Sequence, residues 1–137
     1  RRFYFSRTIG QISRFDFLIG AEDAGKLVGY LSAKRGKARR IRNTAYLVVG
    51  ILEAYQHQGI GTQLFEWLDD WAKDKGIKRL ELTVMVNNYA AIALYHKQGF
   101  VIEGVRQEAM YVDGKYIDEF YMSKIYPSVS PDETVIN

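Results

Sequence analysis

Near the middle of the chain, an apolar segment leads through a glycine-containing turn into an amphipathic helix. Residues 44–52 are apolar at almost every position, as expected for a central strand that is covered on both faces. From Gly59 to Lys75, apolar side chains recur at helical spacing, and Gly76 supplies a stop signal. These helical apolar residues are Ile60, Leu64, Trp67, Leu68 and Trp71. The succession of strand, turn and helix indicates an α/β domain with this strand inside the sheet.

The flanking segments predict further strands and one more helix. Asp23, Ala24 and Gly25 separate two apolar-rich segments in the manner of a β-hairpin. Asn88 is a candidate N-cap of a short helix that Gly99 closes. The predicted strands are 15–22, 26–34, 44–52, 78–86, 100–106 and 116–125, and the predicted helices are 59–75 and 89–98. The expected order is therefore β-β-β-α-β-α-β-β.

Length and composition favour one domain. A chain of 137 residues with 47% hydrophobic residues suffices for a single core, which we assign to residues 1–126. Residues 127–137 contain both prolines and little apolar material, so we expect a flexible tail. No apolar run is long enough to span a bilayer and the N-terminus does not resemble a secretory signal, so we expect a cytoplasmic protein without membrane contact.

Several kinds of chemistry are disfavoured by the residue types present. The chain has no cysteine, which excludes disulfides, thiolate metal sites and cysteine nucleophiles. Its two histidines, His57 and His96, do not have the spacing of a zinc site, so we expect no metal. Residues 1–43 carry 11 Lys/Arg and 3 Asp/Glu, with a peak from Lys34 to Arg42. That run can attract an anion or nucleic acid, but it has no interleaved aromatic residues, and nucleic acid is not an expected partner.

The turn before the long helix is a candidate anion site. At a helix N-terminus, several backbone N–H groups lack intrahelical partners and the helix dipole is positive, so a pyrophosphate can bind there. Glycine at positions 59 and 61 allows the backbone to come close to phosphates. The P-loop pattern is absent, and Leu64 occupies the third glycine position of a dinucleotide fingerprint. The residues of this turn are Gln56, His57, Gln58, Gly59, Ile60, Gly61 and Thr62.

Two motifs resemble the GNAT superfamily of acyl-CoA-dependent N-acetyltransferases. Q-x-x-G-x-G after a strand is similar to the coenzyme A-binding signature of that superfamily. The segment from Asn88 to Phe100 is similar to its N-x-x-A-x-x-L-Y-x-x-x-G-F pattern. The resemblance covers residues 44–125 and implies a mixed, mostly antiparallel sheet of the α+β type, with central splayed strands and helices on both faces. It also implies more N-terminal elements than the 14 residues before the first predicted strand provide.

The resemblance implies a role for each site residue. The strand before the turn is expected to carry a bulge at Val49, Gly50 and Ile51, whose backbone groups would bind the pantetheine of acetyl-CoA. The turn from Gln56 to Thr62 would hold the pyrophosphate, mainly through backbone amides. Asn88 would contact the pantetheine, and Tyr95 would lie near the thioester sulfur, where a phenol can protonate the leaving thiolate.

The proton acceptor, the amine substrate and turnover itself stay open at this stage. Related enzymes often use a glutamate as general base, but Thr83 occupies that place here, which leaves Glu81, Glu53 or water. The expected reaction is direct attack of a primary amine, from a small molecule or a peptide, on acetyl-CoA. The alternative is a non-catalytic acyl-CoA-binding module. The resemblance also allows a homodimer.

Overall fold

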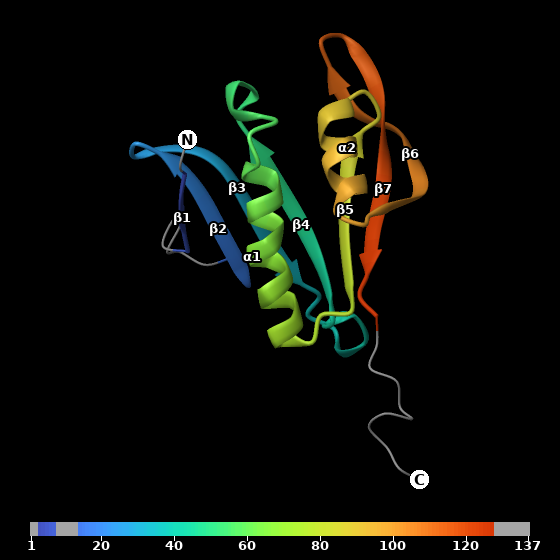
Figure 1. The fold of residues 1–137 in the computed structure, drawn as a ribbon. Helices are drawn as coiled ribbons and strands as arrows, with labels where there is room; N and C mark the ends of the chain where they lie inside the picture. The colour runs from blue at the N-terminus through green and yellow to red at the C-terminus, as the bar shows by residue number, and fades with distance from the viewer. Residues whose placement is uncertain (1–2, 8–13, 128–137) are drawn as a thin grey trace.

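The computed structural model describes residues 3–7 and 14–127, which form a seven-stranded sheet and two α-helices (Figure 1). The strands are β1 (Tyr4–Ser6), β2 (Phe17–Asp23), β3 (Lys26–Arg35), β4 (Thr44–Ile51), β5 (Arg79–Met85), β6 (Val101–Val112) and β7 (Lys115–Ile125). The helices are α1 (Ile60–Lys75) and α2 (Tyr89–Lys97), with two 3₁₀ turns, η1 (Arg39–Ile41) and η2 (Glu53–Tyr55). The tail that the sequence predicts lies, from residue 128 onward, outside the described residues.

The sheet has the mixed, mostly antiparallel character that the sequence predicts. Its strand order is β1-β2-β3-β4-β5-β7-β6, and within the described residues only the β4–β5 pair is parallel. The predicted strands and helices are present with small differences at their ends, except that β6 is much longer than predicted. Sequence analysis missed β1, a three-residue strand that pairs with β2 at the edge of the sheet.

The two central strands separate soon after they meet. β4 and β5 pair at three positions, from Thr44 with Arg79 to Tyr46 with Glu81. In contrast, β4 pairs with β3 at seven positions and β5 pairs with β7 at seven positions. The sheet is therefore two well-paired halves joined by a short parallel ladder, which confirms the prediction of splayed central strands.

Both described helices lie on the same face of the sheet (Figure 1). β5 and β6 run in the same direction, because each is antiparallel to β7 between them. The connections β4–α1–β5 and β5–α2–β6 thus each join two strands of the same direction, and both move toward the β6 edge of the sheet. Both are right-handed crossovers, as is usual, which places both helices on one face. Among the described residues, helices are found on one face, where the resemblance implied both. Neither described helix is long and apolar enough to cross a membrane.

The helices pack closely against each other and against the sheet. A Cβ atom added to Gly61 of α1 would lie 2.6 Å from a methyl carbon of Leu94 in α2. Phe65 of α1 makes edge-on ring contacts with Tyr95 and with Phe100, at centroid distances of 6.1 and 5.7 Å. At the other end of α1, the rings of Trp71 and Phe17 are 5.3 Å apart. These contacts connect the two halves of the sheet through the helix layer.

The bulge that the resemblance implied in β4 is not present. β3 and β4 stay in one-to-one register from Arg35 with Ala45 to Gly29 with Ile51. The irregular pairings in the described sheet occur between β2 and β3 and between β6 and β7. Backbone groups of β4 become available in another way, because its second neighbour β5 turns away.

The β6–β7 hairpin is longer than the sequence predicts. β6 extends to Val112, six residues beyond the predicted end at Arg106, and its pairing with β7 shifts twice, between Ile102 and Gly104 and between Arg106 and Met110. Glu108, inside the second irregularity, has φ 50°. β6 forms one edge of the sheet, and most of its residues are exposed.

The buried face of α1 should dominate the stability of this fold. Leu68→Ala removes a side chain that is fully buried between α1 and the sheet, and we expect it to lower the free energy of unfolding by about 2 to 5 kcal/mol. Glu66→Ala, on the exposed face of the same helix, should change it by less than about 0.5 kcal/mol. Equilibrium denaturation with urea measures both variants, and equal midpoints would contradict the assigned helix orientation.

Candidate active site

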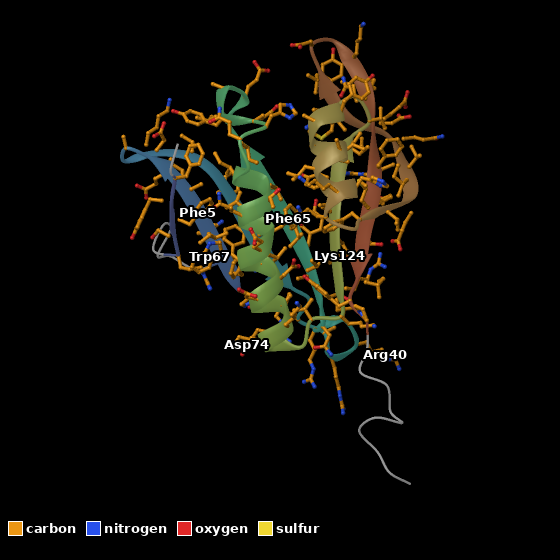
Figure 2. The ribbon with its side chains drawn as sticks, viewed as in Figure 1. Phe5, Arg40, Phe65, Trp67, Asp74 and Lys124 are labelled. Atoms are coloured by element: carbon orange, nitrogen blue, oxygen red, sulfur yellow. The ribbon has the colours of Figure 1, made fainter. Side chains whose placement is uncertain are left out.

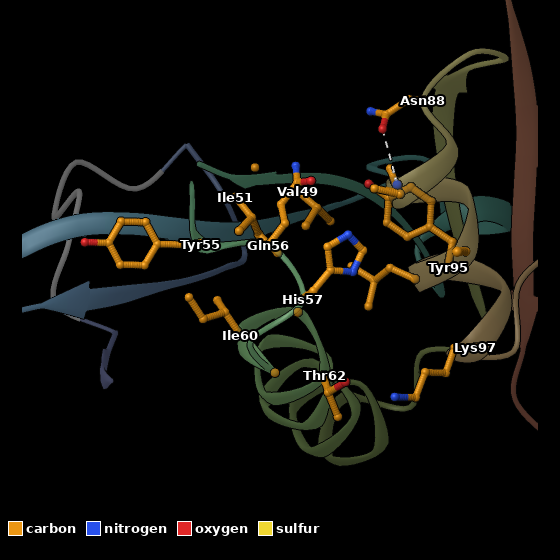
Figure 3. A pocket seen from close by; sticks show the side chains of 17 residues that line it. Val49, Ile51, Tyr55, Gln56, His57, Ile60, Thr62, Asn88, Tyr95 and Lys97 are labelled. Atoms are coloured by element: carbon orange, nitrogen blue, oxygen red, sulfur yellow. Dashed lines mark hydrogen bonds between the residues drawn. The ribbon is translucent and has the colours of Figure 1, made fainter. Parts of the chain in front are cut away.

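A pocket of about 550 Å³ lies where β4, the start of α1 and α2 meet (Figure 3). The divergence of β4 and β5 leaves room for it, and side chains and backbone from all three elements line it. All the predicted coenzyme-binding residues line it except Gln58: Val49, Gly50, Ile51, Gln56, His57, Gly59, Ile60, Gly61, Thr62, Asn88 and Tyr95. The side-chain amide of Gln58 instead donates to the Ala54 carbonyl oxygen, 3.1 Å away.

Backbone amides at the start of α1 are available to a ligand. The first hydrogen bond of the helix runs from Gln63 N–H to the Gly59 carbonyl oxygen at 3.1 Å, and no side chain caps this end. No acceptor within residues 3–7 and 14–127 takes the N–H groups of Gly59, Ile60, Gly61 or Thr62. Because these donors point out of the helix and the dipole is positive here, the turn attracts an anion.

Glycine is favoured at positions 59 and 61 of the turn for two different structural reasons. Gly59 has φ 86°, a left-handed conformation that favours glycine, and a Cβ atom there would meet no atom within 4 Å. Gly61 is required for close packing, because the space of its missing side chain is filled by Leu94. Only Gly59 therefore fits the expectation of a glycine that leaves open space for phosphates.

Two residues of β4 direct unpaired backbone groups to the side of the pocket. The Leu52 amide donates to the Val28 carbonyl oxygen at 2.9 Å, and the Gly36 amide donates to the Thr44 carbonyl oxygen at 3.0 Å. Even-numbered residues of this antiparallel pair thus point their N–H and C=O groups at β3, and odd-numbered residues point theirs at the β5 side. Val49 and Ile51 lie beyond the last position that pairs with β5.

Tyr95 is a buried residue that brings its hydroxyl to the pocket. Only 6% of its surface is exposed, and its ring packs against Phe65 and Phe100. Burial, with smaller contributions from Tyr30 and Tyr46, raises the pKa of Tyr95 to about 12. The phenol therefore keeps its proton through the neutral range and can act as a donor.

Asn88 lies at the start of α2 and lines the same pocket as Tyr95 (Figure 3). Its Oδ1 accepts a hydrogen bond from the Ala91 amide at 3.2 Å, which confirms the predicted N-cap. Within the described residues, its side-chain NH₂ group has no hydrogen-bond partner and remains available as a donor.

The structure adds lining residues that sequence analysis missed, chiefly Lys97. Its side chain extends from the last turn of α2 toward Thr62 at the start of α1 (Figure 3). Lys97 follows Ala90, Ala93 and Leu94 at the i, i+3, i+4, i+7 spacing of one helix face. This spacing could have indicated from the sequence that Lys97 shares a helix face with these residues. The sequence predicted a turn that binds mainly through backbone donors rather than formal charge, whereas this site also has a cation. Tyr55 and Ala91 complete the lining.

Neither candidate carboxylate lines the pocket. Glu81 points to the sheet face opposite the helices, where its Oε2 accepts a hydrogen bond from Arg79 Nε at 2.7 Å. Glu53 is exposed on the η2 turn. At the point where β4 and β5 separate, the Tyr46 and Thr83 hydroxyls form a hydrogen bond of 3.0 Å. Uncharged hydroxyl groups therefore occupy the place where related enzymes have a glutamate.

Comparison with known proteins identifies the family to which this chain is similar. The model of the acetyltransferase (GNAT) family matches residues 3–100, which is more than half of the chain. The L-amino acid N-acetyltransferase AaaT of Escherichia coli is 30% identical over 105 residues, which cover 74% of this chain and 63% of that protein.

Solved structures share the fold. An acetyltransferase of the GNAT family from Streptococcus pneumoniae has a TM-score of 0.76 and 36% identity, covering 81% of this chain and 66% of that one. A GNAT phosphinothricin acetyltransferase from Sinorhizobium meliloti, in complex with acetyl-CoA, has a TM-score of 0.71 and 21% identity, covering 80% and 60%. The chain thus spans less than two thirds of each of these relatives. With the family model, the splayed sheet and the free amides at the start of α1 in agreement, the chain belongs to the acetyltransferase (GNAT) family.

Proposed function

We propose that this protein transfers the acetyl group of acetyl-CoA to a primary amine by direct attack of the amine on the thioester. The observation that carries the proposal is one pocket that combines free backbone donors on α1, free backbone groups on β4 and the hydroxyl of a buried tyrosine. Acetyl-CoA supplies an activated acyl group together with a diphosphate and two amide groups. Each of these parts has a matching partner in the pocket.

The start of α1 fits the diphosphate. The amides from Gly59 to Thr62 supply fixed dipoles, and Lys97 supplies a positive charge from the facing helix. Gly59 leaves the approach open. The side chains of Gln56 and His57 complete this end of the pocket.

The exposed edge of β4 fits the amides of the pantetheine. Val49 and Ile51 offer both N–H and C=O groups, so an extended ligand can pair with them as an additional strand would. The NH₂ group of Asn88 is a further donor from the opposite wall. The thioester would then lie toward Tyr95, which supports a role for this hydroxyl in protonating or hydrogen-bonding the leaving thiolate.

The acceptor we propose is an α-amine. Among residues 3–7 and 14–127, no carboxylate lines the pocket, which supports an amine that arrives largely as its free base or loses its proton to water. At pH 7 about one tenth of a typical peptide α-amine is unprotonated, against fewer than about one in a thousand lysine side chains. The name of the E. coli relative, an L-amino acid N-acetyltransferase, points to the same class.

Release of free coenzyme A thiol tests the proposed function. The protein should release thiol from acetyl-CoA only when an amine is added, and α-amines such as amino acids or short peptides should be better acceptors than N-acetyl-lysine, whose α-amine is blocked. The competing function is a non-catalytic acyl-CoA-binding module, suggested by the missing glutamate at Thr83. Binding of acetyl-CoA with no acceptor-dependent release across a panel of amines would favour that module.

Removal of the Tyr95 hydroxyl should affect turnover more than binding. We expect Tyr95→Phe to lower kcat by at least about a hundredfold, because the leaving thiolate loses its proton donor. The Kd for acetyl-CoA should change little, since the ring packing is kept. Tyr89→Phe, at the exposed start of α2, is the matched control. A Tyr95→Phe variant with wild-type kcat would remove Tyr95 from the mechanism.

The pH dependence should follow the acceptor. If the amine attacks as a free base, kcat/KM rises with pH up to the pKa of that amine and then levels off. Because burial raises the pKa of Tyr95 to about 12, its hydroxyl stays protonated and causes no decline at moderately alkaline pH. Profiles for an amino acid and for its less basic amide should have different inflections. One common inflection near neutral pH would instead indicate a base on the enzyme.

Lys97 should contribute to coenzyme binding. Lys97→Met keeps most of the aliphatic stem and removes the charge, so we expect the Kd for coenzyme A to rise about fivefold, as for the loss of one exposed charge contact. Lys73→Met, on the exposed side of α1 and outside the pocket, should leave the Kd unchanged. Isothermal titration calorimetry measures both values, and equal effects would show that Lys97 acts only through the net charge.

A further inference from the structure

A second hollow, of about 730 Å³, lies at the opposite end of α1 and is lined by cations. Four separate chain segments supply them: Arg14 before β2, the end of β3 with the following loop, Arg42 before β4, and Lys75 at the end of α1. The cationic side chains that line it are Arg14, Lys34, Arg35, Lys37, Arg42 and Lys75. Folding therefore collects positive charge here from more of the chain than the basic run in the sequence.

These charges are left almost without carboxylate partners. Lys34 Nζ donates to the Arg14 carbonyl oxygen at 2.8 Å, and Arg35 Nε donates to the Arg42 carbonyl oxygen at 2.7 Å. Both acceptors are neutral, so the side chains are ordered while their charges remain. Among the described residues of the lining, only Asp16 is acidic, and it accepts a hydrogen bond from the Arg35 backbone amide at 2.7 Å.

The remaining cations of the hollow are also not neutralised by a close carboxylate among the described residues. Lys75 Nζ is 3.7 Å from an Asp74 carboxylate oxygen, and both side chains are more than half exposed, so the pair contributes little. Within the described residues, the side chains of Lys37 and Arg42 have no hydrogen-bond or ion-pair partner. A cluster of like charges at this density is unfavourable unless an anion joins it.

The loop that carries the cations is closely packed and held by its own contacts. A Cβ atom added to Gly36 would lie 2.5 Å from the carbonyl oxygen and from a side-chain carbon of Ile41, so the loop closes tightly on itself. The Arg35 guanidinium is further oriented by Asn43 Oδ1 at 3.4 Å. An anion that binds here would not have to order the loop first.

We propose that this hollow binds an anion that carries several linked phosphate groups. A terminal phosphate group carries up to two negative charges and each linked group about one, so a short chain of phosphates brings several closely spaced negative charges to these six cations. Arginine side chains also match phosphate oxygens with two parallel hydrogen bonds. Arg39 and Arg40 of η1 continue the positive surface beyond the hollow, and Figure 2 shows Arg40 at the end of the molecule where α1 finishes near Asp74.

This site is separate from the proposed coenzyme site. Lys75 is the last residue of α1, and the free amides of the candidate active site are at its first residues. A helix of 16 residues is about 24 Å long. A phosphate group of the coenzyme that is bound at the start of α1 therefore does not reach the hollow at Lys75. The inference holds whether or not the protein proves to be an acetyltransferase.

The test uses inorganic tripolyphosphate as the probe, with coenzyme A present at saturation. We expect binding that weakens as the salt concentration rises, with NMR shift changes at the backbone amides of Lys37 and Asn43. The double variant Lys37→Glu/Arg42→Glu should raise the Kd at least about tenfold. Lys115→Glu, an exposed lysine at the start of β7, makes the same kind of charge change elsewhere and should leave the Kd nearly unchanged.

A single-stranded oligonucleotide in the same assay distinguishes the source of the phosphates. Tighter binding than tripolyphosphate, lost in the double variant, identifies a nucleic acid strand, and weaker binding identifies a free oligophosphate. Acetyl transfer and the circular dichroism spectrum should be unchanged in the double variant, so that a folding defect is recognised. No binding of either probe at low salt, or equal binding by wild type and the double variant, would overturn the proposal.

Discussion

The architecture depends on a parallel ladder of only three residue pairs between β4 and β5. On either side of it, long antiparallel pairings hold each half of the sheet together, so the two halves are free to diverge after Tyr46 and Glu81. The helix layer limits the divergence, since α1 and α2 contact each other at Gly61 and Leu94. A strand edge with free backbone groups and a helix end with free amides consequently lie around one opening.

The candidate site depends on backbone geometry more than on particular side chains. That is why a local sequence pattern predicted so much of it. The apolar strand, the left-handed Gly59 and the amphipathic helix follow from short-range preferences, and these fix the position of the α1 amides. The N-cap at Asn88 and the short helix that carries Tyr95 were predictable for the same reason.

Features that depend on long-range packing were not predicted. The sequence showed that Lys97 is on a helix, but its approach to Thr62 depends on how closely α2 packs on α1. The resemblance implied a bulge in β4, whereas the free groups of Val49 and Ile51 come from the departure of β5. The sequence indicated that the basic run from Lys34 to Arg42 can attract an anion, but it did not show that the fold places Arg14 and Lys75 beside this run. The length of β6 was underestimated because most of its residues are exposed and its pairing is irregular. Both features weaken the alternation of apolar and polar residues that identifies a strand in a sequence.

The irregular pairing of β6 also affects how the molecule behaves at high concentration. This edge strand exposes Val101, Ile102 and Val105, an apolar run that would favour pairing with the same strand of another molecule. The shifts around Gly104 and Glu108 break the even spacing of its outward N–H and C=O groups and increase the local twist. A foreign strand cannot continue hydrogen bonding along the whole edge, and the hairpin is thereby protected against amyloid-like stacking.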